Sequence, residues 1–332
     1  MEPLVSILIP AYNAEKWIQY TLKSALGQTW PRKEIIVVDD GSSDNTLPIL
    51  RSYECKSVKV ITQENMGAPA ARNKALSFAQ GEFIQWLDHD DLLDHDKIFN
   101  QIGNGEYDGS TRILLSGAFG TFFFRERKAK FTPNSLWKDL QPIDYFLIKF
   151  GEDSWLHTSV WLVSRKLTDI AGGWGEVKSP DDDGEYFCRV VAASERIRFF
   201  PESRSYWRIG NFKAMSQRRS DDALEALFKS NSKCIHYLRS LEDSERTRKA
   251  SLKYLQLNIA KYYPDKREIL EKVNELAREL GGSVLPKETR KFLCVRKMVG
   301  WKVAQKIKTI LWNTEILARS SWDRLLYILS NR

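Results

Sequence analysis

GEFIQWLDHDDLLD, residues 81–94, joins a short apolar run to three closely spaced carboxylates. The run FIQWL is bounded by turn-forming residues, which is typical of a strand buried inside a parallel sheet. Asp88, Asp90 and Asp91 follow at the point where that strand ends. Because neighbouring carboxylates repel one another, a cation between them would favour this arrangement. Hard oxygen ligands suit Mg²⁺ or Mn²⁺, whereas the motif taken alone is also compatible with a solvated acidic turn.

The rest of the first hundred residues alternates strand and helix patterns. Apolar runs predict strands, and apolar residues at helical spacing predict helices. In chain order, starting with a strand, the predicted elements cover residues 4–9, 14–26, 34–38, 43–53, 58–62 and 68–79, and a further strand begins at residue 83. This order predicts an open, mostly parallel α/β sheet.

Polar residues follow the strands at one edge of this predicted sheet. Ligands of open α/β sheets bind beyond the carboxyl ends of the strands. After the first two strands the candidate ligand-contacting residues are Pro10, Tyr12, Asn13, Asp39 and Asp40. We therefore expect these loops and the acidic loop to converge on one site.

Three segments that together span about residues 3–95 resemble the family 2 inverting glycosyltransferases, whose nucleotide-sugar-binding fold is called GT-A. They are SILIPAYNAEKWIQYTLKSALGQTW, EIIVVDDGSSDNT and NMGAPAARNKALSFAQGEFIQWLDHDD. Two later segments, HTSVWLVSRKLTDIAGGWGEV and SPDDDGEYFCRV, are similar to the second half of that family's catalytic domain. The early segments keep the family's motif order, so the likeness is more specific than any single motif.

The resemblance implies an α/β fold of the GT-A type, a Rossmann-like domain with a mostly parallel central sheet, over residues 1–215. It also implies transfer of a sugar from a nucleotide-diphosphate sugar, expected to be a UDP-sugar, to a hydroxyl of a glycan or lipid-linked acceptor. The anomeric configuration would be inverted, and the pathway would be cell-surface polysaccharide or lipopolysaccharide biosynthesis. Residues 103–134 are interpreted as variable loops that, with the C-terminal helices, would select the sugar and the acceptor.

The same resemblance assigns residues to the donor site. Asp40, with Asp39 beside it, would accept the ring N–H of the nucleotide base, and the ring of Tyr12 would lie against that base. Pro10 and Asn13 belong to the same donor-binding loop.

The metal site and the nucleotide side of the pocket are assigned in the same way. Arg72 would reach the nucleotide, although a surface arginine on an exposed helix face is the alternative interpretation. Asp90 would bind the Mn²⁺ or Mg²⁺ ion directly, and Asp88 would contact the ribose, or the metal through water. Asp91 could instead cap a helix that begins near Leu92.

The acidic run in SPDDDGEYFCRV supplies a candidate general base. An acceptor hydroxyl must lose a proton as it attacks, and one carboxylate opposite the leaving group suffices for in-line attack with inversion. We predict Asp183 as this base, with Asp182 as the second choice. A helix-capping role falls to Asp181 or Asp182.

Composition limits the remaining possibilities. A chain of 332 residues with 42% apolar content can bury a large core and has room for an appendage. The four cysteines lack metal-ligand spacing, which fits a reducing compartment. Because no apolar run approaches about 18 residues and no N-terminal signal is found, we expect a cytoplasmic protein, peripheral on the inner face of the cell membrane.

Residues 216–332 are predicted to form a helical C-terminal region, because strand patterns give way to helical apolar spacing. Residues 287–332 hold eleven Lys or Arg and three acids, a net charge of +8 that equals the excess of the whole chain. With their Trp and Leu residues they predict basic, amphipathic helices on an anionic membrane surface. The alternative is a helical hairpin that buries these Trp residues against the catalytic domain.

Other classes of function are less compatible with the sequence. Nucleic-acid binding is not expected, because the catalytic half has no basic patch or binding motif. A nucleotidyltransferase would normally carry a glycine-rich, basic phosphate loop after the first strand, where PAYNAEKW stands. A non-catalytic nucleotide-sugar-binding or membrane-scaffold protein would not require the acids Asp90 and Asp183.

Overall fold

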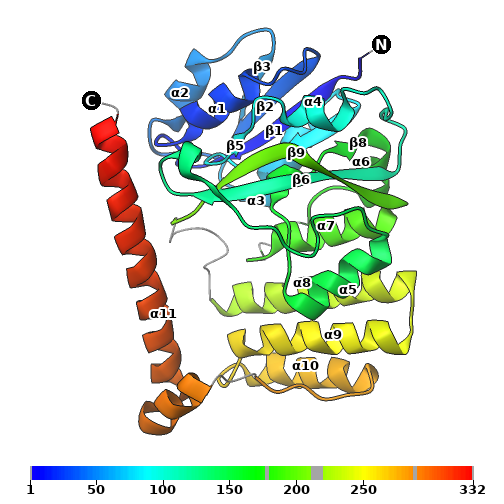
Figure 1. Cartoon of the computed structure of the whole chain (residues 1–332), viewed down its shortest axis with the longest axis vertical. Helices are drawn as coiled ribbons and strands as arrows, with labels where there is room; N and C mark the ends of the chain where they lie inside the picture. The colour runs from blue at the N-terminus through cyan, green and yellow to red at the C-terminus, as the bar shows by residue number, and fades with distance from the viewer. Residues whose placement is uncertain (1, 176–178, 211–219, 287–289, 331–332) are drawn as a thin grey trace.

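The computed structural model describes residues 2–175, 179–210, 220–286 and 290–330. Its first half builds a five-stranded sheet in the order β3-β2-β1-β4-β8 (Figure 1). The strands are β1 (Val5–Ala11), β2 (Lys33–Asp39), β3 (Val58–Thr62), β4 (Phe83–Trp86) and β8 (Val163–Ser164). Pairing is parallel except for β8, which joins β4 in the antiparallel direction. The predicted α/β fold with a mostly parallel central sheet is confirmed.

Helices cover both faces of this sheet, which explains why every residue of β1 is buried. Side chains alternate between the faces, so Leu8 belongs to one apolar cluster while Ile7 and Ile9 belong to the other. The cluster with Ile7 includes residues of α1 (Ile18–Leu26), α2 (Thr46–Ser52) and α4 (Lys97–Ile102). The cluster with Leu8 includes residues of α3 (Ala68–Phe78), α5 (Pro142–Glu152), α6 (Arg165–Ala171) and α7 (Asp182–Ala193).

A second sheet, in the order β5-β9-β6-β7, completes the α/β part. Its strands are β5 (Leu92–Leu93), β6 (Ile113–Phe122), β7 (Lys130–Phe131) and β9 (Arg196–Arg208). The β6 and β9 strands pair in parallel and cross closely at Gly117, where an added Cβ would lie 2.1 Å from the carbonyl oxygen of Ser203. The interpretation of residues 103–134 as loops is therefore wrong for β6, whose apolar sequence ILLSGAFGTF forms a mostly buried strand.

The helices α8 (Asp221–Leu241), α9 (Glu245–Asn258) and α10 (Arg267–Glu279) follow the α/β part. They extend the apolar cluster that contains Leu8, and the rings of Phe150 on α5 and Tyr254 on α9 stack at 4.0 Å. The predicted helical C-terminal region is thus confirmed. The predicted boundary between residues 215 and 216 lies outside the described residues and stays a prediction.

The last helix, α11 (Arg290–Ser330), runs along one side of the molecule (Figure 1). Gly300 has φ 77°, a left-handed value that interrupts the helix and favours glycine. Among the described helices, none has both the length and the apolar character needed to cross a membrane.

Candidate active site

The acidic loop lies directly beyond the carboxyl end of β4, as predicted. Asp88 and Asp90 are half-buried, and Asp91 is buried. Leu92 begins the short strand β5, and the next helix starts only at Lys97, so the expected capping role of Asp91 is wrong. Asp91 Oδ1 instead accepts a hydrogen bond of 2.8 Å from the backbone N–H of Arg208 at the end of β9.

One carboxylate oxygen of this loop, Asp91 Oδ2, is buried and has no hydrogen-bond donor among the described residues. The nearest cationic candidate is His157, whose Nε2 lies 3.2 Å away, but burial lowers the pKa of His157 to about 4 and leaves the ring neutral. Burial, together with the charges of Asp90 and Asp88, raises the pKa of Asp91 well above its usual value.

These residues fit a divalent cation. Asp88, Asp91 and His157 offer three ligand atoms that lie within 4.8 Å of one another. Two carboxylates, one with a buried oxygen that lacks a donor, form the kind of oxygen-rich site that Mg²⁺ and Mn²⁺ prefer. Asp90 is not one of these three residues, so the direct metal contact assigned to it stays a prediction.

Arg72 links the acidic loop to α7. Its guanidinium donates to Asp88 Oδ1 and to Asp182 Oδ2, each at 2.8 Å, and its side chain is only 7% exposed. Burial opposes ionisation of Asp88, but Arg72 outweighs it and holds the pKa of Asp88 below its usual value. The alternative interpretation of Arg72 as an exposed surface residue is therefore wrong.

Aromatic side chains hold Arg72 from the other side. Its guanidinium lies 4.1 Å from the ring centre of Trp174, and the rings of Trp174 and Tyr186 stack at 4.2 Å. Trp86, at the end of β4, meets the edge of Trp174 at 5.2 Å. These contacts fix the direction of the arginine and hence the relative positions of Asp88 and Asp182.

We expect Arg72→Met to lower the free energy of unfolding by about 3 to 5 kcal/mol, because it leaves the carboxylates of Asp88 and Asp182, which are 26% and 10% exposed, without their partner. The loss should be smaller at acidic pH, because in the variant burial without Arg72 raises the pKa of both carboxyls, and protonation removes their unpaired charges. Urea unfolding at pH 7.5 and pH 4 measures both effects. As a matched control, Arg51→Met removes the exposed pair with Glu54 and should change stability by less than about 1 kcal/mol. Equal losses for the two variants would contradict the bridging role.

The three acids of the SPDDDG run lie at the start of α7. Asp181 occupies the N-cap position but makes no side-chain capping bond, and Asp182 and Asp183 lie in the first turn. Asp183 Oδ2 accepts a hydrogen bond of 3.3 Å from Thr158 Oγ1. Burial, with repulsion from Asp181 and Asp182, raises the pKa of Asp183 to about 7. A carboxylate with this pKa is well matched to taking up a proton near neutral pH.

At the end of β2 the two neighbouring acids have different surroundings. Asp40 Oδ1 accepts from Gln63 Nε2 at 2.7 Å and from the N–H of Met66 at 2.9 Å, while Oδ2 accepts from the N–H of Gly67 at 2.8 Å. Asp39 Oδ2 accepts from the N–H of Ser42, but its buried Oδ1 has no donor among the described residues. Asp40 therefore joins β2 to the loop before α3, whereas Asp39 keeps one carboxylate oxygen that no described residue satisfies.

The loop after β1 lies beside this pair. Pro10 is buried within β1, whereas the side chain of Tyr12 is 47% exposed. Asn13 has φ 46°, and its Oδ1 accepts from the N–H of Ser43 at 2.9 Å. Asn13 thus holds the loop after β1 against the loop after β2. The ring of Tyr12 stays exposed beside them, where a flat ligand could lie against it.

Arg208 is a supporting residue that the sequence did not reveal. Its Nε donates to the carbonyl oxygen of Asp90 at 2.8 Å, and its guanidinium lies 3.8 Å from the ring centre of Trp17. Together with its backbone bond to Asp91, these contacts fix the acidic loop. No local signal marks Arg208, because it reaches the loop from β9, more than a hundred residues later in the chain.

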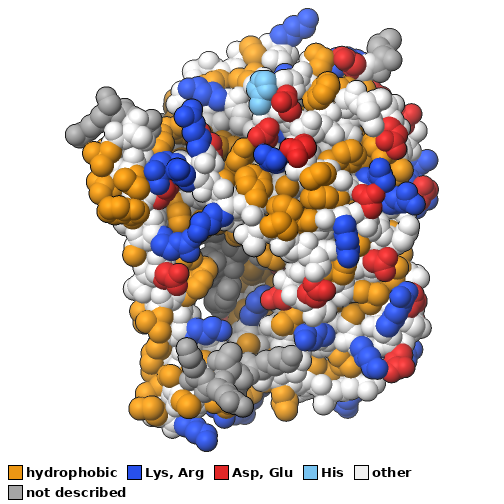
Figure 2. Space-filling view, in the orientation of Figure 1, with side chains coloured by type: hydrophobic (Ala, Val, Ile, Leu, Met, Phe, Trp, Pro, Cys, Tyr) orange, Lys and Arg blue, Asp and Glu red, His pale blue; other side chains and the backbone are white. Residues whose placement is uncertain are grey.

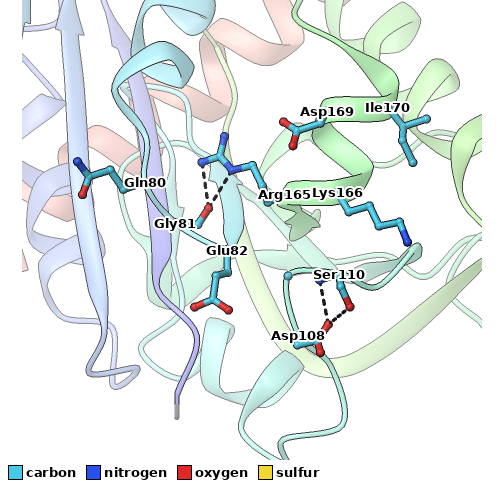
Figure 3. A pocket seen from close by; sticks show the side chains of 10 residues that line it. Gln80, Gly81, Glu82, Asp108, Ser110, Arg165, Lys166, Asp169 and Ile170 are labelled. Carbon is cyan, nitrogen blue, oxygen red and sulfur yellow. Dashed lines mark hydrogen bonds between the residues drawn. The ribbon is translucent and has the colours of Figure 1, made fainter.

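A separate cavity of about 770 Å³ lies at the opposite edge of the sheet. It is lined by residues that precede β4 and β6 and by the first turns of α6, including Glu82, Asp108 and Arg165 (Figure 3). The Arg165 guanidinium is already bonded to the carbonyl oxygens of Ala79 and Gly81. This cavity is remote from the carboxyl ends of the strands and contains none of the predicted site residues.

Comparison with known proteins identifies a family that matches the first half of the chain. Residues 6–153 match the model of the family described as Glycosyl transferase family 2. The putative teichuronic acid biosynthesis glycosyltransferase TuaG of Bacillus subtilis is 45% identical over 104 residues, which is 30% of this chain and 41% of TuaG. The UDP-Glc:alpha-D-GlcNAc-diphosphoundecaprenol beta-1,3-glucosyltransferase WfgD of Escherichia coli is 44% identical over 100 residues, which is 30% of this chain and 40% of WfgD.

Among solved structures, residues 1–349 of S. aureus TarS in complex with UDP-GlcNAc superpose with a TM-score of 0.65. The sequences are 20% identical, and the superposition covers 82% of this chain and 81% of that one. This likeness concerns the fold. The chain matches only about two fifths of the length of TuaG and WfgD.

Proposed function

We propose that the protein is an inverting glycosyltransferase of family 2, because residues 6–153 match the model of that family and the chain has the GT-A fold. Its donor is a nucleoside diphosphate sugar, and its acceptor is a hydroxyl group of a glycan or lipid-linked saccharide. The observation that carries the proposal is the Arg72 bridge between Asp88 and Asp182. This bridge holds the acidic loop next to the start of α7. The candidate base Asp183 therefore lies at the same site as the proposed metal ligands.

The carboxylates after β4 are the proposed cation site. Asp88, Asp90 and Asp91 would hold Mn²⁺ or Mg²⁺, with His157 beside them. When bound, the cation supplies positive charge against the leaving diphosphate. Arg208 holds the backbone of this loop, and Arg72 holds Asp88 in its ionised form.

Asp183 is the proposed general base. It accepts the proton of the acceptor hydroxyl while the hydroxyl oxygen attacks the anomeric carbon and the nucleoside diphosphate leaves on the opposite side. One such displacement inverts the configuration. Thr158 orients the carboxylate through its hydroxyl, and Arg72 fixes the neighbouring Asp182.

The donor nucleotide is proposed to carry a base with a ring N–H, as uridine does. Asp39 Oδ1 is the buried acceptor that lacks a donor, and the exposed ring of Tyr12 lies in the adjacent loop. The base contact is therefore assigned to Asp39, and Asp40 supports the loop. A UDP-sugar donor also accords with the name of WfgD, which specifies UDP-Glc.

This assignment predicts how the protein discriminates between nucleotides. With Mn²⁺ present, calorimetry should show tighter binding of UDP than of CDP, because the cytosine ring presents an acceptor where uracil presents an N–H. Asp39→Asn should weaken UDP binding by about 5- to 150-fold, the range for one unsatisfied buried hydrogen-bond partner, and should reduce the preference over CDP. Asp40→Asn is the matched control: it should lower the melting temperature, because it disturbs the bonds from Met66 and Gly67. If Asp40→Asn alone abolished the preference, the two roles would be exchanged.

The acceptor and the pathway are proposed from the relatives. TuaG is named for teichuronic acid biosynthesis, and WfgD for an acceptor linked to diphosphoundecaprenol. For this chain the proposed reaction combines the two: synthesis of a cell-surface polysaccharide on a lipid-linked acceptor.

A further inference from the structure

We propose that α11 binds the surface of an anionic lipid bilayer, with its apolar side chains among the lipids and its basic side chains at the headgroups. The inference rests on the arrangement of α11 and does not depend on the transfer activity. It begins from an apolar face that points away from the rest of the described chain.

This face forms a stripe that we call the outer stripe. It consists of Val303, Ile307, Ile310, Leu317, Leu325 and Ile328. Successive members are separated by multiples of a helical turn, which places them on one side of the helix. Each is between 36% and 59% exposed, and the adjacent Trp322 is 63% exposed. Figure 2 shows hydrophobic side chains along the edge of the molecule where Figure 1 places α11.

The opposite face of α11 is attached to the α/β part through polar contacts. Asp323 accepts from the backbone N–H of Phe124 at 2.9 Å and from Arg125 Nε at 2.8 Å. The hydroxyls of Tyr327 and Tyr20 lie 3.1 Å apart. If the outer stripe packed on the core of the protein, α11 would be rotated about its axis so that the stripe faced the α/β part. The alternative in which the tail buries its Trp residues is therefore wrong for Trp312 and Trp322, which are 53% and 63% exposed.

The charges of α11 suit an anionic lipid surface. Lys306 lies one helical turn from Val303 and from Ile310, and Arg324 lies one turn from Ile328, so these two basic side chains border the outer stripe. Both are exposed. Long basic side chains beside an apolar stripe can reach lipid phosphates while their methylene groups stay near the acyl chains. Asp323 is one of only two acids in residues 290–330, and it is already engaged with Arg125.

The position of α11 also relates it to the proposed site. The ring of Tyr327 lies 6.1 Å from that of Phe124, and Phe124 lies 5.5 Å from Trp17. Trp17 in turn lies under Arg208, which holds the acidic loop. A bilayer bound to α11 would thus fix the orientation of the donor site toward acceptors that are themselves anchored in lipid.

Co-sedimentation of the full chain with lipid vesicles tests this inference. Binding should be strong to vesicles of phosphatidylcholine and phosphatidylglycerol, weak to phosphatidylcholine alone, and reduced in high salt. Ile310→Asp should weaken binding to the anionic vesicles at least about tenfold, because an apolar contact is replaced by a charge. The matched control is Ile170→Asp on α6, where the isoleucine is similarly exposed and binding should be unchanged.

A second pair of variants tests the charges. Replacing Lys306 and Arg324 by Gln should weaken anionic binding by about 25-fold, since each basic residue contributes about fivefold. Replacing the exposed Lys229 and Lys233 by Gln removes the same net charge elsewhere and should have a much smaller effect. Equal effects of the two double variants, or of the two Asp variants, would overturn the proposal. The proposal would also be overturned if the wild type were a dimer, Ile310→Asp were a monomer, and neither bound vesicles. In that case the outer stripe would bind a second copy of the chain.

Discussion

Asp183→Asn is expected to lower turnover by about 10² to 10⁴, the usual contribution of a positioned general base, with donor affinity nearly unchanged. The amide keeps the shape of the side chain and the bond to Thr158 but cannot accept the acceptor's proton. Steady-state turnover and calorimetric binding of the donor separate the two effects. The acid limb of kcat/KM for the wild type should have its midpoint near pH 7, the pKa of Asp183 in the free protein.

The same substitution should increase stability at alkaline pH. Because the folded-state pKa of Asp183 is raised from 3.8 to about 7, the folded protein retains a proton that the unfolded chain releases between about pH 4 and pH 7. Folding stability therefore falls as the pH rises through that window. Asp183→Asn removes this loss, so its gain should be small at pH 4 and should reach roughly 4 kcal/mol at pH 8.

Asp182→Asn is the control for both measurements. Asp182 is bonded to Arg72, so its replacement should destabilise the bridge. A variant at position 182 that lost turnover while Asp183→Asn retained it would move the base by one residue.

Asp90→Asn is expected to lower metal-dependent transfer by about 10²-fold or more, because it removes a proposed ligand of the cation that stabilises the leaving diphosphate. Binding of the nucleotide in the presence of Mn²⁺ should weaken, and the fold should stay intact, since the half-buried Asp90 carboxylate makes no hydrogen bond among the described residues while its backbone is held by Arg208. Turnover, Mn²⁺-dependent binding and thermal unfolding measure these three effects.

Asp96→Asn provides a matched control, because Asp96 is exposed and bonds to Thr29 away from the acidic loop. It should keep near wild-type turnover. Transfer that persists in excess EDTA, or in Asp90→Asn at the wild-type rate, would contradict the proposed metal role.

The local sequence was sufficient to predict the four parallel strands of the central sheet but not the short antiparallel strand β8. The expected strand over residues 58–62 coincides with β3, and the expected helix over residues 68–79 differs from α3 by one residue. These elements are predictable because a buried parallel strand and an amphipathic helix each leave their own period in the sequence. The helix α1 begins at Ile18 rather than at residue 14, since the preceding residues form turns.

The contacts that build the site could not be predicted from the sequence, because they join distant segments. Arg72 and Asp182 are 110 positions apart, and Arg208 and Asp90 are 118 apart. Lys97 is another example: it lies fully buried and donates to Gln85, although a lysine is normally expected at the surface. The pattern located the acidic loop and the start of α7, but only the fold brings in Arg72 and Trp174 and distinguishes Asp39 from Asp40.

The central claim is metal-dependent transfer with inversion, and the sugar released from the donor tests it directly. The full chain is incubated with a panel of nucleoside diphosphate sugars and Mn²⁺, with water as the acceptor, and proton NMR follows the first sugar formed before its anomers interconvert. We predict that one donor releases its nucleoside diphosphate together with a sugar of inverted configuration, and that EDTA or Asp183→Asn suppresses the release. A sugar of retained configuration, or equal release by Asp183→Asn, would contradict the account, and tight donor binding without any release would favour a non-catalytic binding protein.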